Sequence, residues 1–109
     1  MNTEERDPNG KSLHETGSKA DAGKTRLGLV LGGFANALEQ VGQIGTAGAA
    51  KYTDNGWKDV PNGVERYTDA LLRHMLAQMR GEVFDPQSGQ PHAAHVAWNA
   101  LAVLELMKR

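Results

Sequence analysis

Acidic, imidazole and amide side chains gather in one short stretch of the chain. The segment GEVFDPQSGQPHAAHVAWN contains Glu82, Asp85, His92, His95 and Asn99. It spans the point where one helical pattern ends and another begins, so a turn could bring carboxylates and imidazoles together. Carboxylate oxygens are the ligands that Mg²⁺ prefers, and such a metal offsets phosphate charge and orients water. We therefore expect this stretch to form part of a metal-dependent phosphate site.

Each half of this stretch also has a plainer interpretation. Glu82 and Asp85 form an E-x-x-D pair, which is also common in an ordinary acidic turn. His92, His95 and Asn99 recur at i, i+3 and i+7, so they form a polar stripe on one face of a helix. The stripe occupies one end of an otherwise apolar helix, which favours a polar cavity there, although a solvated surface stripe has the same pattern. Paired imidazoles also suit transition metals, so a histidine-based metal site stays open.

Charged residues elsewhere in the chain extend the same hypothesis. Glu39 is the acid of an apolar, glycine-rich segment, and it either enters the site from a facing helix or faces solvent beside other polar residues. Lys51, Arg66 and Arg73 are candidate phosphate ligands, because the forked guanidinium donors of arginine match phosphate oxygens. The alternative for these cations is a solvated face with weak salt bridges.

Aromatic residues in the following loop suit a nucleotide base. Tyr52 and Trp57 are candidates for stacking on the base, with Asn55 between them in the sequence and Asn99 as a further nucleotide contact. The alternative is that these aromatic side chains only pin the loop to the rest of the protein.

Hydrophobic periodicity predicts three main helices that position these residues. The first runs from about 33 to 50, and its glycines permit close approach of another helix. A loop rich in Asp, Asn, Gly and Pro follows. The second helix ends near Arg80, with Asn62 and Glu65 as a capping box at its start and Gly81 as its C-cap. The third starts at Pro91, with Ser88 or Gln90 as cap, and continues to near residue 109. The predicted fold is therefore an all-α bundle.

Length and composition divide the chain into two parts. Residues 1–26 carry few large apolar side chains among many polar ones, so we expect a disordered or loosely attached tail. Residues 27–109 form the predicted helical domain. A core of that size is marginally stable alone, which favours a homo-oligomer, a dimer or a tetramer, that completes the bundle.

Composition also excludes several classes of protein. The formal net charge is −1, which argues against direct nucleic-acid binding through a concentrated basic face. The chain has no cysteine, so disulfides and zinc–thiolate sites are excluded. It has neither an apolar run long enough for a membrane span nor a signal-peptide segment, and we expect a cytoplasmic protein.

Three runs of the sequence, GAAKYTDNGW, RYTDALLRHMLAQMRGE and DPQSGQPHAAHVAWNAL, resemble a phage-associated family. Its members are described as dATP/dGTP diphosphohydrolases, similar to the all-α MazG-type nucleotide pyrophosphohydrolases. The resemblance covers about Lys24 to Leu106 and includes Glu39. The matching positions are Lys51, Tyr52, Asn55, Trp57, Arg66, Tyr67, Ala70, Arg73, His74, Gly81, Glu82, Asp85, Ser88, Gly89, His92, His95 and Asn99.

The resemblance implies Mg²⁺-dependent hydrolysis, with Mn²⁺ as an alternative, of dATP or dGTP to the monophosphate and pyrophosphate by a phage or prophage protein in a bacterial host. Relatives of the MazG type use two acidic motifs and act as dimers or larger assemblies. The second motif corresponds to Glu82 and Asp85, and the first is reduced to Glu39, because Gly42 and Gln43 stand where a second acid is expected. Glu39, Glu82 and Asp85 are thus the predicted catalytic and metal-binding carboxylates. His92 and His95 either complete the metal site or bind phosphate in the pocket.

Two other functions remain compatible with the sequence. One is a histidine-rich metallophosphohydrolase that uses His74, His92, His95 and Asp85. The other is a non-catalytic helical module that binds a nucleotide or another protein, which the reduced first motif favours.

Overall fold

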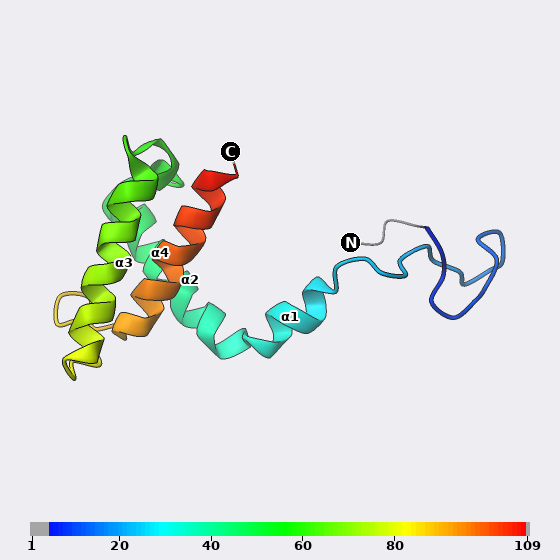
Figure 1. The fold of residues 1–109 in the computed structure, drawn as a ribbon, viewed down its shortest axis with the longest axis horizontal. Helices are drawn as coiled ribbons and strands as arrows, with labels where there is room; N and C mark the ends of the chain where they lie inside the picture. Colours follow the sequence, from blue (N-terminus) through cyan, green and yellow to red (C-terminus); the bar gives the residue numbers. More distant parts are fainter. Residues whose placement is uncertain (1–4, 109) are drawn as a thin grey trace. The chain divides into compact units, whose positions relative to one another are not determined.

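The computed structural model describes residues 5–108, and regular structure in this range is helical (Figure 1). Four α-helices and one short 3-10 helix follow each other in these described residues. They are α1 (Leu27–Gly33), α2 (Ala35–Lys51), η1 (Gly56–Asp59), α3 (Gly63–Met79) and α4 (His92–Met107). The described range contains no strand, only an isolated bridge between Phe84 and Pro91. The all-α prediction is therefore confirmed.

The chain divides into two compact units after Gly33. In the described part of the first unit, turns precede α1. Asp7 is buried there and its carboxylate accepts the backbone N–H groups of Asn9, at 2.7 Å, and Lys19, at 3.0 Å. The boundary predicted at residue 26 and the disorder predicted for 1–26 remain predictions, and residues 1–4 of that range lie outside the described part.

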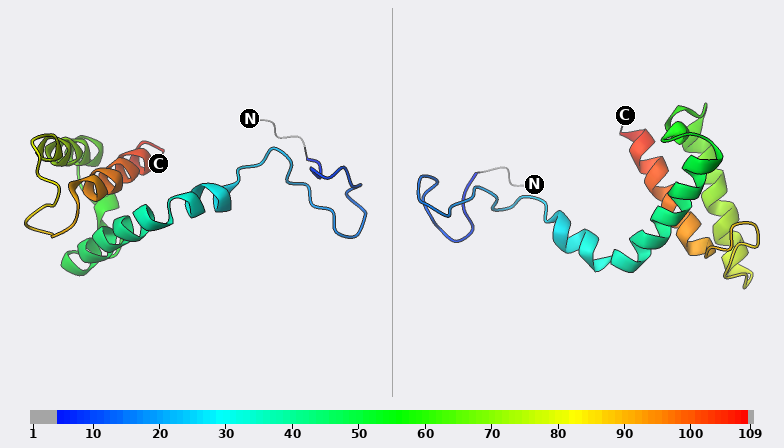
Figure 2. Two further views of the ribbon diagram at one scale, coloured as in Figure 1. Left: turned by 90° about the horizontal axis from the view of Figure 1, so that it is seen from below. Right: turned by 180° about the vertical axis from the view of Figure 1, so that it is seen from behind.

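The second unit is built around α4. Helices α3 and α4 run in opposite directions and make the most extensive contact, while α2 packs on α4 from another side (Figures 1 and 2). Helix α4 is therefore shared by both contacts. This arrangement places the start of α4, which carries His92 and His95, beside the second half of α3.

The end of α3 explains the position of the loop that follows. Gly81 has φ of +97°, a left-handed conformation that glycine adopts without steric cost. Its N–H donates to the carbonyl of Gln78 at 2.9 Å, and the N–H of Glu82 donates to that of Ala77 at 3.1 Å. These two bonds form a Schellman motif, so the predicted role of Gly81 in ending the helix is confirmed.

Other helix ends differ from the sequence prediction. The helix predicted from about 33 to 50 corresponds to α2, and the short α1 that precedes Phe34 was not predicted. Asn62 precedes α3 with φ of 55°, in the left-handed region, and no side-chain hydrogen bond caps the helix, so the predicted capping box is wrong. Pro91 itself is the N-cap of α4, and neither Ser88 nor Gln90 caps that helix.

Aromatic side chains join the three elements beside α2. Trp57 of η1, Tyr67 of α3 and Trp98 of α4 meet edge to face, with ring centroids 5.6–6.4 Å apart. The Tyr67 hydroxyl also donates to the carbonyl of Trp57 at 3.1 Å. A Cβ on Gly45 would lie 3.1 Å from Trp98 Nε1, so a glycine there lets α2 approach α4 closely, as predicted for this helix.

In the described range, no helix combines the length and the apolar character that crossing a membrane requires.

Candidate functional site

A broad open groove runs along the second unit between α2 and the α3–α4 pair. Its walls are formed by the second half of α2, the loop through η1, one face of α3, the loop before α4 and the first turns of α4. Predicted site residues from all of these elements line it. They are Lys51, Tyr52, Asn55, Trp57, Arg66, Arg73, Asp85, His92, His95 and Asn99.

Two predicted carboxylates are not part of the groove lining. Glu39 is exposed on α2, about one turn before the first residue of that helix that lines the groove. Glu82 lies on the loop after α3, with its side chain 51% exposed. The three acids predicted to share a metal are thus not gathered on the groove wall, where Asp85 stands without Glu39 and Glu82.

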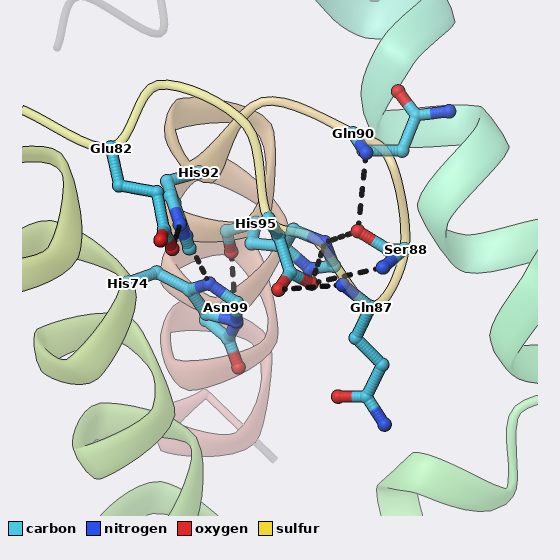
Figure 3. A network of polar contacts seen from close by, with 9 residues as sticks. His74, Glu82, Gln87, Ser88, Gln90, His92, His95 and Asn99 are labelled. Atoms are coloured by element: carbon cyan, nitrogen blue, oxygen red, sulfur yellow. Dashed lines mark hydrogen bonds and ion pairs between the residues drawn. The ribbon is translucent and has the colours of Figure 1, made fainter.

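Three imidazole rings meet at the end of the groove where α4 begins (Figure 3). Nδ1 of His74, on α3, lies 2.8 Å from Nδ1 of His92. Nε2 of His92 lies 2.7 Å from a carboxylate oxygen of Glu82. The ring of His95 stacks on that of His74, with centroids 4.2 Å apart and planes only 4° from parallel. Helix packing therefore joins the two histidines of the predicted stripe to a third from the facing helix.

The loop between α3 and α4 presents Asp85 and Ser88 to this cluster. The Asp85 N–H donates to the carbonyl of Gln90, and the His92 N–H donates to that of Val83, so the loop closes on itself. The carboxylate of Asp85 accepts the N–H groups of Gln87 and Ser88, both at 3.3 Å.

His95 meets both polar groups of this loop through one nitrogen. Its Nε2 lies 2.7 Å from Ser88 Oγ and 3.5 Å from the Asp85 carboxylate. A serine nucleophile in a catalytic triad needs the acid on the other ring nitrogen of the histidine. The geometry is therefore not that of a catalytic triad.

A side-chain hydrogen bond ties the same loop to α2. The amide Nε2 of Gln90 donates to Oε1 of Gln43 at 2.9 Å. Both residues line the groove, so this bond links its two walls at the histidine end.

Partial burial shifts the ionisation of this cluster. Burial lowers the pKa of His74, and the neighbouring His95 and His92 add to the effect. Burial likewise lowers the pKa of His95, although Asp85 acts in the opposite direction. Burial raises the pKa of Asp85, but hydrogen bonds from Ser88 and Gln87 and the nearby His95 outweigh it, so the pKa lies below its ordinary value. Near neutral pH, therefore, the imidazoles of His74 and His95 are neutral and the carboxyl group of Asp85 is ionised.

The cations of the groove lack acidic partners within the described residues. No ion pair between described residues joins Lys51, Arg66 or Arg73 to a carboxylate. Arg66 donates weakly to the carbonyl of Pro61, at 3.4 Å, and the ammonium of Lys51 lies 5.1 Å from the ring centroid of Tyr52. The alternative in which these cations are neutralised by salt bridges is thus not what the structure shows. Their charge is available to an anion.

The aromatic and amide residues predicted to contact the nucleotide differ in their exposure and in their contacts with the rest of the protein. Tyr52 is 72% exposed at the edge of the groove. Trp57 packs on Tyr67 and Trp98, which agrees with the alternative that it pins the loop. Asn99 is buried and donates from Nδ2 to the carbonyl of His95 at 2.8 Å. Asn55 adopts a left-handed conformation with φ of 55° ahead of η1. Their roles as nucleotide contacts remain predictions.

The residues of the described range do not form a ready-made metal site. No group of three or more histidine, aspartate or glutamate side chains in that range converges on one point as metal ligands would. Both ring nitrogens of His92 already have protein partners, and both oxygens of Asp85 accept hydrogen bonds. The ligand set of Glu39, Glu82, Asp85, His92 and His95 therefore remains a prediction that this geometry does not support.

Sequence reasoning gave little weight to several residues that the fold brings to the site. His74 was given a role only in the histidine-based alternative, yet it contacts both His92 and His95. Gln43 and Gln90 were not predicted to interact. Their separation of 47 positions leaves no local signal, and only the packing of α2 on α4 brings them together.

Comparison with known proteins places the chain in a family. The family described as "dATP/dGTP diphosphohydrolase, N-terminal" matches residues 14–109. A dATP/dGTP diphosphohydrolase of Salmonella phage PMBT28 is 33% identical over 92 residues, which are 84% of this chain and 30% of that protein. The chain thus spans about a third of the length of this relative. No solved structure matches it significantly. Because the family match covers nearly the whole chain, including all the groove residues, the protein belongs to the dATP/dGTP diphosphohydrolase N-terminal family.

Proposed function

We propose that this domain binds a purine deoxynucleoside triphosphate, dATP or dGTP, in the groove and hydrolyses it to the nucleoside monophosphate and pyrophosphate. The observation that carries the proposal is that unpaired cations, neutral imidazoles and an ionised carboxylate line one groove in a member of this family. The name of the Salmonella phage relative agrees with this substrate class.

The groove has two chemically different ends that suit the two ends of a nucleotide. Lys51, Tyr52 and Arg66 lie toward η1, and the histidine cluster lies at the start of α4. Arg73 stands two helical turns beyond Arg66 on α3, next to His74. In the proposed orientation the base and sugar lie toward Tyr52. The triphosphate then extends past the arginines, whose guanidinium groups would stabilise negative charge on the transferred phosphorus.

Neutral imidazoles fit the role of general base better than the acids predicted from the sequence. A general base works best when its pKa lies near the working pH, and the lowered pKa values of His74 and His95 keep both rings unprotonated at neutral pH. Asp85, whose pKa is lowered, is a weaker base. We therefore infer that a histidine of the cluster accepts the proton of the attacking water.

We propose that Mg²⁺, or Mn²⁺ in its place, reaches the groove already bound to the triphosphate. Mg²⁺ keeps several water ligands and is commonly held by one or two carboxylates plus substrate phosphates, so a complete protein cage is not required. Asp85 is the predicted metal-binding carboxylate that lines the groove. A bound metal would offset charge on the phosphates.

The deciding experiment is incubation of the purified chain with each dNTP and NTP in the presence of Mg²⁺ or Mn²⁺, with EDTA as the metal-free control. Ion-exchange chromatography separates the products. The expected products from dATP or dGTP are the nucleoside monophosphate and pyrophosphate. Nucleoside plus triphosphate would instead support the histidine-centred phosphohydrolase.

A second candidate function is nucleotide binding without turnover by this domain. It is favoured by the length of the relative, since this chain corresponds to 30% of that protein. Saturable dATP or dGTP binding by calorimetry, with no product under any metal condition, would identify this function.

A further inference from the structure

A continuous hydrogen-bonded row links Glu82 to the groove through two imidazoles. The carboxylate of Glu82 meets Nε2 of His92 at 2.7 Å, and Nδ1 of His92 meets Nδ1 of His74 at 2.8 Å. The three residues come from the loop, from α4 and from α3, and Figure 3 shows them side by side. Both contacts join side chains of different elements, so the row forms only because α3 packs against α4.

The chemistry of the partners fixes the direction of every hydrogen bond when the imidazoles are neutral. An ionised carboxylate only accepts, so Nε2 of His92 must donate to Glu82. A neutral imidazole carries one N–H, which leaves Nδ1 of His92 as an acceptor. Nδ1 of His74 must then donate to it. The lone pair of His74 is consequently on Nε2.

The three residues of the row differ in burial, and the residue at its inner end faces the groove. His92 in the middle is 4% exposed, so its rotation is restricted. Glu82, at the outer end, is half exposed and lies outside the groove lining. His74, at the inner end, lines the groove. Within the described chain Nε2 of His74 has no hydrogen-bond partner. It is also not sealed from solvent, since no buried side-chain nitrogen or oxygen there lacks a partner.

The neighbouring His95 lacks a comparable constraint. Its Nε2 contacts the hydroxyl of Ser88, which both donates and accepts, so this partner does not select one tautomer. The contact of the same nitrogen with the Asp85 carboxylate is longer, at 3.5 Å, and therefore fixes the proton less firmly. Of the two stacked rings, His74 is the one connected to a carboxylate by hydrogen bonds shorter than 3 Å, through His92.

We propose that Glu82 and His92 are positioning residues that hold His74 as its Nδ1–H tautomer, so that Nε2 accepts the proton of the water that attacks the nucleotide. This inference rests on the proposed function for its catalytic part. The proton enters at Nε2 of His74, and the proton on Nδ1 of His74 passes to Nδ1 of His92. The positive charge then resides on His92 beside Glu82. The new bond forms from the water oxygen to the α-phosphorus. The bond from the α-phosphorus to the oxygen that bridges to the β-phosphorus breaks, and pyrophosphate leaves with its electron pair.

The tautomers can be measured without substrate. Long-range proton–nitrogen NMR of the full chain labelled with ¹⁵N-histidine at pH 8 distinguishes Nδ1–H from Nε2–H, and His74→Gln and His92→Gln variants assign the signals. We expect His74 as Nδ1–H and His92 as Nε2–H. In Glu82→Leu the His74 signal should shift toward a mixture of tautomers, while Glu105→Leu, an exposed acid on α4, should leave it unchanged. His74 found as Nε2–H in the unmodified chain overturns the proposal, and this measurement requires no variant at Glu82 to fold.

Turnover tests the catalytic part separately. His74→Gln should lower kcat by about 10²–10⁴-fold, the usual contribution of a general base. Glu82→Leu should lower it by about 10–100-fold, by analogy with the loss found when a group that orients a metal-bound imidazole is removed, with KM changed much less. A Glu82→Leu variant with normal kcat and a shifted His74 tautomer would overturn the catalytic part. If the unmodified chain turns over no nucleotide, the proposed function and the catalytic part fail together, and the NMR result still decides the positioning.

Discussion

Stacked and hydrogen-bonded imidazoles share a small volume at the start of α4, and few of them can be charged together. His74 and His95 lie face to face at 4.2 Å, and His74 also contacts His92. Desolvation already disfavours the charged form of His74 and His95, and each added positive charge raises that cost. The cluster is therefore stable as neutral rings, and acid should disrupt it.

This arrangement predicts a loss of stability between neutral and mildly acidic pH. The folded-state pKa values of His74 and His95 lie below the ordinary value of 6.5, so the unfolded chain binds protons first as the pH falls. The free energy of unfolding contributed by these rings is fully present above pH 6.5 and decreases below it. Urea unfolding at pH 8, 7, 6 and 5 measures it. The His74→Gln, His95→Gln double variant should show a flatter profile, and an unchanged slope would contradict the assignment.

The arginine next to the cluster gives a second residue-scale prediction. Arg73 lines the groove without an acidic partner in the described chain, whereas Arg80, at the end of α3, lies outside the lining. A hydrogen bond to a charged group contributes about 1.5–3 kcal/mol, so Arg73→Gln should weaken dATP or dGTP binding by about 10–100-fold. Calorimetric titration measures the change. Arg80→Gln is the matched control, and an equal loss there would indicate a general effect of net charge.

At the scale of elements, two glycines should respond to the same substitution in opposite ways. Gly81→Ala places a side chain in the left-handed region at the end of α3, which costs about 1–2 kcal/mol. Gly42 lies inside α2, where an added Cβ would meet nothing within 4 Å, so Gly42→Ala should stabilise by up to about 1 kcal/mol. Urea midpoints measure both. A destabilised Gly42→Ala variant would show that this position is covered by a partner.

The local sequence predicted elements better than it predicted contacts between them. The helices α3 and α4 and the end of α3 at Gly81 follow from patterns within a few residues of the sequence, and the structure confirms them. The capping box failed because Asn62 is left-handed, which no spacing rule reveals. The stripe of His92 and His95 was visible in the sequence as a helix face. Its meeting with His74 was not predictable, because that requires the register of α3 against α4.

At the scale of the whole molecule, the most notable feature is how little apolar surface is buried. Among the described residues, the buried apolar side chains are those of alanines, and no large side chain is fully buried. Leu101 and Leu104 are one helical turn apart on α4, and each is more than half exposed. A helix that is apolar all round is normally covered on every side. On α3, Leu72, Leu76 and Met79 form a second exposed stripe at helical spacing.

These exposed stripes predict that the chain associates with a second copy of itself through α3 and α4. Burial contributes about 25 cal/mol per Å² of apolar surface, so covering several leucines would add the stability that the small core lacks. Light scattering coupled to size-exclusion chromatography should give a dimer or tetramer. Leu101→Glu or Leu76→Glu should shift the chain to a monomer with a lower Tm, whereas Glu105→Leu, also on α4, should not dissociate it. A monomeric unmodified chain at all concentrations, as stable as the two leucine variants, would mean that these side chains face solvent and that the groove is complete in one copy.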